Sequence, residues 1–600
     1  MKSSLCWSAD FETTTDLDDC RVWAYALSNI ENPKDFRYGN SIEDFINFCA
    51  SSKENYTMYF FNLKFDGAFI LSYLLTNGYT RVDKASERKT KTFTTLITDK
   101  GLFYAIEIYF EVKKHRTNKV KIIDALKIFP NFSVETLAEA FGLPISKLEL
   151  DYSEYRPVGH ELTPHEVDYI RNDVEIVAWA LKAMFDKGLT RMTIASNAMQ
   201  DFRKRCKHFK KLFPTLPPDV DAGIRESYRG GFTYLNEKCA GEIQGKGVSI
   251  DVNSLYPSTM KLLPMPIDYP IYFEGKYDPD PSYPLYVQVI CCRFNLKPNK
   301  IPCIQIKNSL SFIPNEYLKS SDGQLITLTL TNPDLELFLD QYDISDESYL
   351  CGWKFHASMN VFDNYIDYWM EEKIRASKEG NKPLKTIAKT MLNSLYGRFA
   401  VSLHARQKAP YLDTRGKVCY YNLPEETKKG CYIPVASFIT AYGRNKTIRT
   451  SQIVRDYTIE KYGVDKYWYS DTDSIKSGLN DDDLSELKDA IQLDDYKLGY
   501  WALEEHIDRF LGLRQKCYIT EVEGKVHVTV AGLPKYLAPL ITFDNFKKGF
   551  TTSGLNLEDM RRIAKQNGAT EEEIKKLHHK LSYTYVNGGV VLTDTDFTIK

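Results

Sequence analysis

Two acidic clusters lie far apart in the chain, and each follows a short apolar run. Asp251 lies in the run IDVNSLYPS, whereas Asp471 and Asp473 lie in YSDTDS. Each run is typical of a short strand that presents carboxylates at its end. A sheet that pairs the two strands would bring at least two carboxylates together, and Mg²⁺ prefers such oxygen ligands. The clusters therefore predict a site where two divalent cations, Mg²⁺ or Mn²⁺, support phosphoryl transfer.

The segment KTIAKTMLNSLYGRF, between the two clusters, has the periodicity of an amphipathic helix. Four polar or aromatic side chains share one narrow face, namely Lys385, Lys389, Asn393 and Tyr396. Apolar residues between Leu384 and Leu395 cover the adjacent face. Two lysines one turn apart suit a polyphosphate, because each ammonium can lie against several phosphate oxygens. We expect the apolar face to pack inside the protein and the other face to reach a nucleotide.

A separate set of carboxylates begins near the N-terminus. Asp10 and Glu12, in SLCWSADFETTT, fall on the same side of a predicted strand because they are two residues apart. Asp66 lies where a predicted strand in YTMYFFNLKFDGAFILSYLL passes into a helix. A D-x-E triplet is common in a long chain, so the pair gains meaning only with the carboxylates that follow.

A helix predicted from Pro164 completes this second set. Thr163 is the expected N-cap, and Glu166 closes a capping box with it. The helix places Tyr169 and Asp173 one turn apart on the same face. Four carboxylates and a phenol are able to bind two metal ions and orient a water molecule for phosphodiester hydrolysis. Their order and residue types predict a 3′–5′ exonuclease.

Composition limits the classes of protein that the chain can represent. With 600 residues and 43% hydrophobic content, several folded domains are expected. The net charge of −2 argues against a uniformly basic nucleic-acid binder, although FRKRCKHFKK (202–211) could form a local track. Twelve scattered cysteines indicate neither a zinc site nor a disulfide framework. No apolar run approaches the ~20 residues of a membrane span, and the acidic N-terminus is unlike a signal peptide. We expect an intracellular protein without a membrane partner.

Ten motifs occur in the order found in one enzyme family. They are DFETTT, NLKFDGAF, YIRND, YRGGF, DVNSLYPS, KTMLNSLYGRF, TAYGR, YSDTDS, RQKCY and GGVVLTDTDFTIK. On these motifs the chain resembles the protein-primed family B DNA polymerases over nearly its whole length. The resemblance implies a DNA-directed DNA polymerase with a proofreading 3′–5′ exonuclease. It also implies an α/β multi-domain fold, in which an RNase H-like exonuclease domain precedes a right-hand polymerase domain with palm, fingers, thumb and two insertions.

The resemblance also implies domain limits. They are exonuclease 1–193, palm 194–262 and 433–540, first protein-priming insertion 263–360, fingers 361–400, second insertion 401–432, and thumb 541–600. The first insertion is expected to hold the priming protein and the downstream duplex. The second, with a turn signal at Arg415-Gly416, is expected to form a hairpin that projects from the palm, closes a ring around DNA and supports processivity and strand displacement. In the thumb we expect two added helices, broken at Gly568 and restarted by Thr570, and a final hairpin that turns at Asn587-Gly588.

Residue roles follow from the resemblance, position by position. The polymerase site is implied to hold metal with Asp251, Asp473 and the Val252 carbonyl, with Asp471 beside them; the exonuclease site is implied to hold it with Asp10, Glu12, Asp66 and Asp173. Tyr256 resembles the gate that excludes a 2′-hydroxyl; Lys385 and Lys389 match triphosphate ligands; Asn393, Tyr396 and Gly397 match positions around the nascent base pair. The implied DNA contacts are Lys516 and Tyr518 on the primer, Thr440 and Arg444 on the template, the hinge residues Tyr228, Arg229, Gly230 and Gly231, and Thr13, Asn62 and Phe65 on a single strand. Tyr169 is an implied catalytic residue of the exonuclease, and Lys147 resembles a catalytic auxiliary there.

Two departures from the family pattern bear on these roles. Ala125 stands where the family has Ser or Thr before Leu126, which removes a hydroxyl from the single-strand contact. Cys517 separates Lys516 from Tyr518 where a Thr is usual.

The implied partners are template and primer DNA, dNTPs and a terminal protein that primes synthesis. The enzyme would be a monomer alone and a heterodimer with that protein, in the cytoplasm of a bacterial host. Two other hypotheses are a DNA repair nuclease whose polymerase half only grips DNA, and a non-enzymatic replication scaffold or single-strand binder. The first predicts loss of Asp251 or Asp473, and both are present. The second leaves two sets of carboxylates unused, and a nucleotide-incorporation assay discriminates it.

Overall fold

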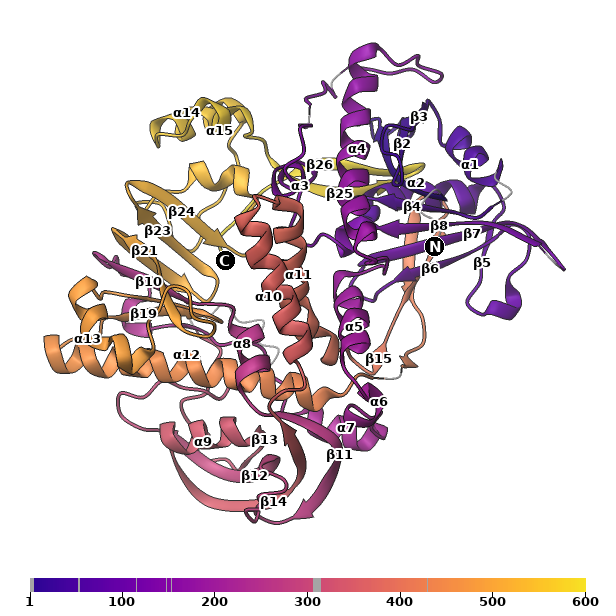
Figure 1. The fold of residues 1–600 in the computed structure, drawn as a ribbon. Helices are drawn as coiled ribbons and strands as arrows, with labels where there is room; N and C mark the ends of the chain where they lie inside the picture. The colour runs from indigo at the N-terminus through magenta and orange to yellow at the C-terminus, as the bar shows by residue number, and fades with distance from the viewer. Residues whose placement is uncertain are drawn as a thin grey trace.

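The computed structural model describes residues 5–51, 54–114, 116–146, 148–152, 154–305, 315–428 and 430–600. It is a mixed α/β structure in which the N-terminal third forms one mass and the central and C-terminal segments form a second one beside it (Figure 1). The yellow C-terminal hairpin reaches back to the N-terminal mass, whereas the last residue, Lys600, lies beside Arg514 in the second mass (Figure 1). No helix in the described ranges is long and apolar enough to span a membrane.

The N-terminal domain is built on an eight-stranded sheet with the order β3-β2-β1-β4-β8-β7-β6-β5. Its strands are β1 (Cys6–Thr13), β2 (Val22–Asn29), β3 (Phe36–Gly39), β4 (Tyr56–Phe60), β5 (Thr80–Arg81), β6 (Thr92–Ile97), β7 (Phe103–Lys113) and β8 (Arg116–Asp124). β4 runs parallel to both β1 and β8. Its helices are α1 (Ile42–Ser51), α2 (Leu63–Thr76), α3 (Val134–Phe141) and α4 (Pro164–Asp186). β2 is buried at every position, because α4 covers one face of the sheet and α1 and α2 cover the other.

The start of α4 is as predicted from the sequence. The Thr163 hydroxyl accepts a hydrogen bond from the Glu166 backbone, and the Glu166 carboxylate accepts one from the Thr163 backbone at 2.9 Å. Pro164 occupies the first turn, where its missing N–H costs nothing. This capping box fixes where the helix begins, and so fixes which of its residues face β1.

The second mass is built on a five-stranded antiparallel sheet, which we call the central sheet. Its strand order is β21-β10-β20-β19-β9. Its strands are β9 (Thr233–Leu235), β10 (Gly247–Val252), β19 (Tyr467–Asp471), β20 (Ser474–Ser477) and β21 (Trp501–Ile507). The long helix α12 (Ile433–Tyr462) packs against it. Smaller helices nearby are α5 (Ile194–Arg205), α6 (Phe209–Leu212), α7 (Pro218–Arg225), α8 (Leu255–Leu262) and α13 (Asp481–Ile491).

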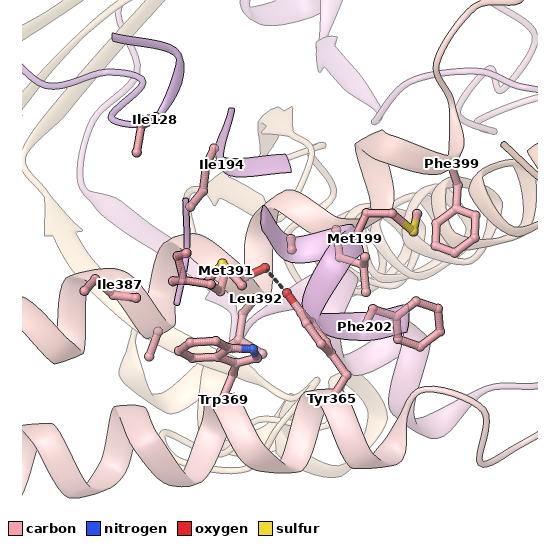
Figure 2. Close-up of a cluster of buried hydrophobic side chains, with 14 of the residues drawn as sticks. Ile128, Ile194, Met199, Phe202, Tyr365, Trp369, Ile387, Met391, Leu392 and Phe399 are labelled. Carbon is pink, nitrogen blue, oxygen red and sulfur yellow. Dashed lines mark hydrogen bonds between the residues drawn. The ribbon is translucent and has the colours of Figure 1, made fainter. Parts of the chain in front are cut away.

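Two antiparallel helices, α10 (Asp363–Lys378) and α11 (Lys382–Phe399), form a helix pair between the two masses (Figure 1). Gly380, at φ 66°, ends α10, and the Asn381 side chain caps α11 by accepting from the Leu384 backbone at 3.0 Å. The buried faces of the pair, of α5 and of the segment around Ile128 enclose one hydrophobic cluster (Figure 2). Within it the Tyr365 hydroxyl donates to the Met391 carbonyl at 2.7 Å. This core holds the helix pair against both masses.

The chain between the central strands and the helix pair forms a separate four-stranded sheet, the inserted sheet, with the order β11-β14-β12-β13. Its elements are β11 (Met265–Glu274), β12 (Leu285–Leu296), β13 (Ile326–Thr331), α9 (Asn332–Gln341) and β14 (Tyr342–Ser358). α9 also packs on α12, which joins this sheet to the central one.

The segment 401–432 contains the expected hairpin, but the hairpin does not project freely. Its elements are β15 (His404–Ala405), β16 (Lys408–Leu412), β17 (Val418–Asn422) and β18 (Glu426–Thr427). Val418 is buried in the core of the N-terminal domain, and Gln407 bridges to Thr98 there. At the turn, Lys417 bridges to Asn587 of the C-terminal hairpin. The hairpin is thus anchored to two distant parts of the chain, although Tyr411 and Tyr421 stay exposed, and we call the segment 401–432 the strap.

The C-terminal region follows the predicted pattern. Its elements are β22 (Arg509–Arg514), β23 (Cys517–Val522), β24 (Lys525–Val530), α14 (Leu557–Gln566), α15 (Glu571–Lys575), β25 (Lys580–Val586) and β26 (Gly589–Thr595). Gly568 has φ 83°, and Thr570 caps α15 in a capping box with Glu573, so the two added helices are confirmed. Val586 pairs with Gly589, which confirms the two-residue turn at Asn587-Gly588. A side chain at Gly588 would meet the Cys20 carbonyl at 2.1 Å, so the turn lies directly on the N-terminal domain.

Candidate active sites

The central sheet brings the two acidic clusters together, as predicted. β10 pairs with β20, and Asp251 lies opposite Ser474. The Val252 backbone N–H donates to the Asp473 carbonyl at 2.8 Å. The carboxylate clusters, which are far apart in the sequence, therefore meet at one end of adjacent strands.

The turn that carries Asp473 is held from several sides. Thr472 has φ 58°, a left-handed conformation that is uncommon for a β-branched residue. Its backbone N–H donates to the Phe232 carbonyl at 2.6 Å, and its carbonyl accepts from the Thr447 hydroxyl at 2.7 Å. A side chain at Gly231 would approach the Thr472 hydroxyl to 2.7 Å, so only glycine fits there. These contacts fix the turn and the direction of its carboxylates.

The carboxylates repel one another in a partly desolvated site. Burial, followed by the charges of Asp473 and Glu504, raises the pKa of Asp251 to about 7. Burial is also the main cause that raises the pKa of Asp473. Asp471 is engaged differently, since it pairs with Lys516 at 3.2 Å and accepts from the Thr233 hydroxyl at 3.1 Å. A cation bound by Asp251 and Asp473 would relieve the repulsion.

Glu504 is a carboxylate of this site that the sequence analysis missed. In the pairing of β10 with β21, Ser249 lies opposite Glu505 and Ile250 lies opposite Leu503. Glu504 is therefore the extra residue of a β-bulge, a device that redirects a side chain. Its charge raises the pKa of both Asp251 and Asp473. Glu504 could not be identified from the sequence, because a one-residue bulge has no recognisable sequence pattern.

The exposed face of α11 lies near these carboxylates. Lys385, Lys389 and Asn393 are exposed, whereas Leu384, Ala388, Met391, Leu392 and Leu395 are buried, as predicted. Lys389 is close enough to lower the pKa of Asp251.

A third lysine, Lys373 of α10, was not predicted. Burial and the charges of Lys389 and Lys385 lower its pKa. Three cations therefore gather on the helix pair, and a bound polyphosphate would neutralise them. No sequence pattern pointed to Lys373, because its place in the site depends on how α10 packs against α11.

Tyr256 lies in the first turn of α8 and meets Tyr396 of α11, with ring centroids 4.2 Å apart. The two rings connect the strand that carries Asp251 with the helix that carries the lysines. Tyr518, on β23, lies 4.8 Å from the Tyr469 ring, next to Asp471. The expected sugar and primer residues thus border the same carboxylates.

Thr440 and Arg444, the residues expected to contact the template, are both buried. Thr440 is 1% exposed and its hydroxyl donates to the Ala436 carbonyl, while Arg444 is 4% exposed and pairs with Asp334. Arg444 also donates to the carbonyls of Arg229 and Gly230, at 2.7 and 2.8 Å. Neither side chain reaches the surface, so in this structure Arg444 acts on the YRGGF segment rather than on a DNA strand. Tyr228, in the same segment, is near enough to Tyr396 to raise its pKa.

The second carboxylate set assembles on the N-terminal sheet. Asp10 and Glu12 extend from β1, and Asp66 lies in the first turn of α2. Burial and the nearby charges of Asp10 and Glu12 raise the pKa of Asp66 well above its usual value. Such a group of buried carboxylates suits a divalent cation, which would remove the repulsion.

Asp173 and Tyr169 complete this site from α4. Asp173 lines a cavity of about 470 Å³ together with Asp10 and Asn62. Tyr169 is buried, and its hydroxyl lies 2.9 Å from that of Tyr152. Tyr152, which sequence reasoning missed, donates to the Glu12 carboxylate at 3.1 Å. The cavity is large enough for a nucleotide, and two carboxylates of the set, Asp10 and Asp173, line it.

Of the expected single-strand residues, Asn62 lines this cavity. Asn62 has φ 70°, and its side chain donates to the Tyr583 hydroxyl of β25 at 3.0 Å. The Phe65 ring lies 6.0 Å from that of Tyr583, and Thr13 follows a register shift at the end of β1. Ala125 is fully buried, so it offers no surface contact. Lys147 lies outside the described residues.

A second cavity, of about 690 Å³, is strongly basic. Its lining includes Lys121, Arg191, Arg203, Lys204 and Arg398 and no carboxylate. Part of the FRKRCKHFKK run therefore contributes to a cationic surface between the N-terminal domain and α11, as its composition suggested. Such a cationic surface is suited to the phosphates of a nucleic-acid backbone.

Neither set of carboxylates has the arrangement of a complete metal-binding site. In the described part of the chain, no three His, Cys, Asp or Glu side chains converge as a ready-made metal site. The donor sets nevertheless fit Mg²⁺ or Mn²⁺, because each is a crowded group of carboxylates, in which burial and neighbouring charges raise the pKa of Asp66 and of Asp251. Substrate phosphates commonly supply the remaining Mg²⁺ ligands in such sites.

The comparisons with known proteins agree with this geometry. The family model described as "DNA polymerase type B, organellar and viral" matches residues 49–158 and 149–484. The DNA polymerase of Bacillus phage M2 is 41% identical over 99% of each chain. The phi29 DNA polymerase complexed with primer-template DNA has a TM-score of 0.87 and 38% identity over 99% of this chain and 100% of that one. Its complex with primer-template DNA and incoming nucleotides has a TM-score of 0.86 and 39% identity, with the same coverage. The resemblance predicted from the motifs is thus confirmed, and the chain belongs to the organellar and viral type B DNA polymerases, of the phi29 type.

Proposed function

We propose that this DNA polymerase is a two-site enzyme, which extends a primer at the central sheet and removes 3′-terminal nucleotides at the N-terminal sheet. The observation that carries the proposal is the presence of two carboxylate groups on different sheets, one at Asp251 and Asp473 and one at Asp10 and Asp66. A repair nuclease or a passive scaffold would not need both. The family match favours synthesis as the principal activity.

For synthesis, Asp251, Asp473 and the Val252 carbonyl would hold two Mg²⁺ or Mn²⁺ ions, with Glu504 beside them. When bound, the metals activate the primer hydroxyl and stabilise the leaving pyrophosphate. Lys385, Lys389 and Lys373 bind the triphosphate. Tyr256 and Tyr396 form the floor beneath sugar and base, and Tyr256 excludes a 2′-hydroxyl. Lys516 and Tyr518 position the primer end.

For proofreading, Asp10, Glu12, Asp66 and Asp173 would hold the metal ions, which supply an activated water molecule. Tyr169 and Tyr152, linked by their hydroxyls, orient the scissile phosphate or the water. Asn62 and Phe65 bind the last nucleotides of a single strand, with Thr13 beside them. The relatives' structures with single-stranded and primer-template DNA support this division.

The remaining parts are assigned by the same argument. We assign the N-terminal domain as exonuclease, the central sheet as palm, the helix pair as fingers and 541–600 as thumb. The inserted sheet and the strap at 401–432 are the two protein-priming insertions. The inserted sheet receives a terminal protein that primes a linear phage-type genome, in the cytoplasm of a bacterial host. The strap, bridged to the thumb hairpin through Lys417 and Asn587, encloses DNA and so supports processivity and strand displacement.

Two reactions test the proposal. With primer-template DNA, Mg²⁺ and dNTPs, we expect primer extension, and with dNTPs omitted we expect the primer to shorten from its 3′ end. With one labelled nucleotide and the protein product of the neighbouring gene, we expect a labelled protein band. Extension without any shortening would reject the second site, and a failure to label the protein would reject protein priming alone.

A further inference from the structure

A buried lysine lies directly beneath the carboxylates of the central sheet. Lys476 is on β20, shortly after Asp473, and is only 5% exposed. Burying an ammonium group costs several kcal/mol unless it is paired and hydrogen-bonded. The partners of Lys476 therefore show what its charge is used for.

Lys476 has two polar partners. Its Nζ donates to the Ser249 hydroxyl at 2.9 Å and to the Glu505 carboxylate at 3.3 Å. The strand register places Ser249 opposite Lys476, and Ser249 is fully buried. The positions of Ser249 and Lys476 are therefore fixed by the pairing of their strands rather than by loops.

The Ser249 hydroxyl extends this contact to Glu504. It donates to the Glu504 Oε2 atom at 2.9 Å. A serine hydroxyl has one proton to donate and can still accept, so the chain runs in one direction, from Lys476 through Ser249 to Glu504. Glu504 occupies the bulge of β21, where it has no partner residue in the pairing with β10. The Ser249 hydroxyl thus fixes the direction of a carboxylate that the bulge turns toward the site.

Glu504 and Lys476, at the two ends of this series of hydrogen bonds, shift the pKa of Asp251 in opposite directions. Glu504 raises the pKa of Asp251, and Lys476 lowers it. Lys476 therefore compensates part of the repulsion among the carboxylates before any cation arrives, and its hydrogen-bonded chain keeps Glu504 next to them.

We propose that Lys476 is a positioning residue of the polymerase site, which acts through Ser249 to hold Glu504 beside Asp251 and Asp473 and so strengthens binding of the divalent cations. The proposal rests on the proposed two-metal synthesis. It assigns Lys476 no contact with DNA or nucleotide.

Three variants separate positioning from folding. Lys476→Met keeps the length of the side chain but removes the charge, and Ser249→Ala removes only the connecting hydroxyl. Glu505→Gln is the matched control, because it changes the other partner of Lys476 and leaves the chain to Glu504 intact. Each variant is assayed for the Mg²⁺ concentration that gives half-maximal primer extension, and for exonuclease activity in the same preparation.

We expect Lys476→Met and Ser249→Ala to raise the Mg²⁺ requirement of synthesis by roughly tenfold, the typical effect of losing a group that orients a metal ligand. The Mg²⁺ requirement of Glu505→Gln should stay within about twofold of that of the unmodified protein, well under the tenfold effect. Exonuclease activity should not change, because its carboxylates lie on another sheet. Tb³⁺ luminescence, measured without DNA in an Asp66→Ala background, should show a matching loss of affinity.

An unchanged Mg²⁺ requirement and Tb³⁺ affinity in Ser249→Ala would overturn the proposal. So would equal effects of Ser249→Ala and Glu505→Gln, or parallel losses of synthesis, exonuclease activity and melting temperature in Lys476→Met. If the unmodified protein itself added no nucleotides, the proposed function would fail instead, and the Tb³⁺ titration would still report on the positioning.

Discussion

Replacing Asp251 by Asn should stabilise the metal-free protein, although it should abolish synthesis. The pKa of Asp251 is raised from 3.8 to about 7, chiefly by burial and then by Asp473 and Glu504. Because the folded-state pKa is the higher one, the ionised carboxylate opposes folding fully above pH 7, and this cost disappears as the pH falls from 7 toward 4. The full shift corresponds to about 4 kcal/mol. Since the side chain is partly exposed, solvent screening reduces the expected gain to ~1–2 kcal/mol.

The assay is thermal unfolding in EDTA at pH 8 and again at pH 5. At pH 8 the variant should melt roughly 1–2 °C above the unmodified protein. The difference should shrink at pH 5, and at pH 8 added Mg²⁺ should stabilise the unmodified protein more than the variant. Asp495→Asn, at an exposed carboxylate, is the control and should leave the melting temperature unchanged at both pH values. A melting temperature for Asp251→Asn at or below that of the unmodified protein at pH 8 would refute the argument that these carboxylates repel one another.

Three further outcomes follow from the structure. Below pH 7 the Mg²⁺ requirement of synthesis should rise by up to about tenfold per pH unit, since protons compete for Asp251; a flat requirement between pH 7 and 6 would contradict this. Tyr256→Val should open space beside Tyr396 and raise ribonucleotide incorporation relative to deoxyribonucleotide, and unchanged discrimination would remove Tyr256 from the gate role. Replacing His404–Glu426 by a short Gly-Ser linker should leave single-nucleotide addition nearly intact but shorten products on primed circular DNA with a competitor trap; full-length, strand-displacing products would leave the strap without an assigned role.

The sequence predicted those parts of the fold that depend on local patterns. The capping box at Thr163 and Glu166, the periodicity around Lys385 and Lys389, and the turn at Asn587-Gly588 are each encoded within a few residues. The meeting of Asp251 with Asp473 was also predictable, because both clusters follow strand-like runs.

Features that depend on tertiary register were not predictable. Glu504 enters the site through a bulge, Lys373 through the register of two helices, and Tyr152 through a contact with α4. Arg444 was expected at the template, but its partner Asp334 lies in the inserted sheet, and no local pattern shows that the pair is buried. The strap was expected to project because only its own hairpin pattern is visible in the sequence, whereas its anchors belong to distant segments.

The central claim is that two separable sites act on DNA, and one pair of variants tests it. Asp473→Asn and the double variant Asp10→Ala/Asp66→Ala are each assayed for primer extension and for shortening of single-stranded DNA from its 3′ end. Asp473→Asn should abolish extension and keep the shortening, whereas the double variant should do the reverse. Loss of both activities in either protein, with an unchanged melting temperature, would contradict the account.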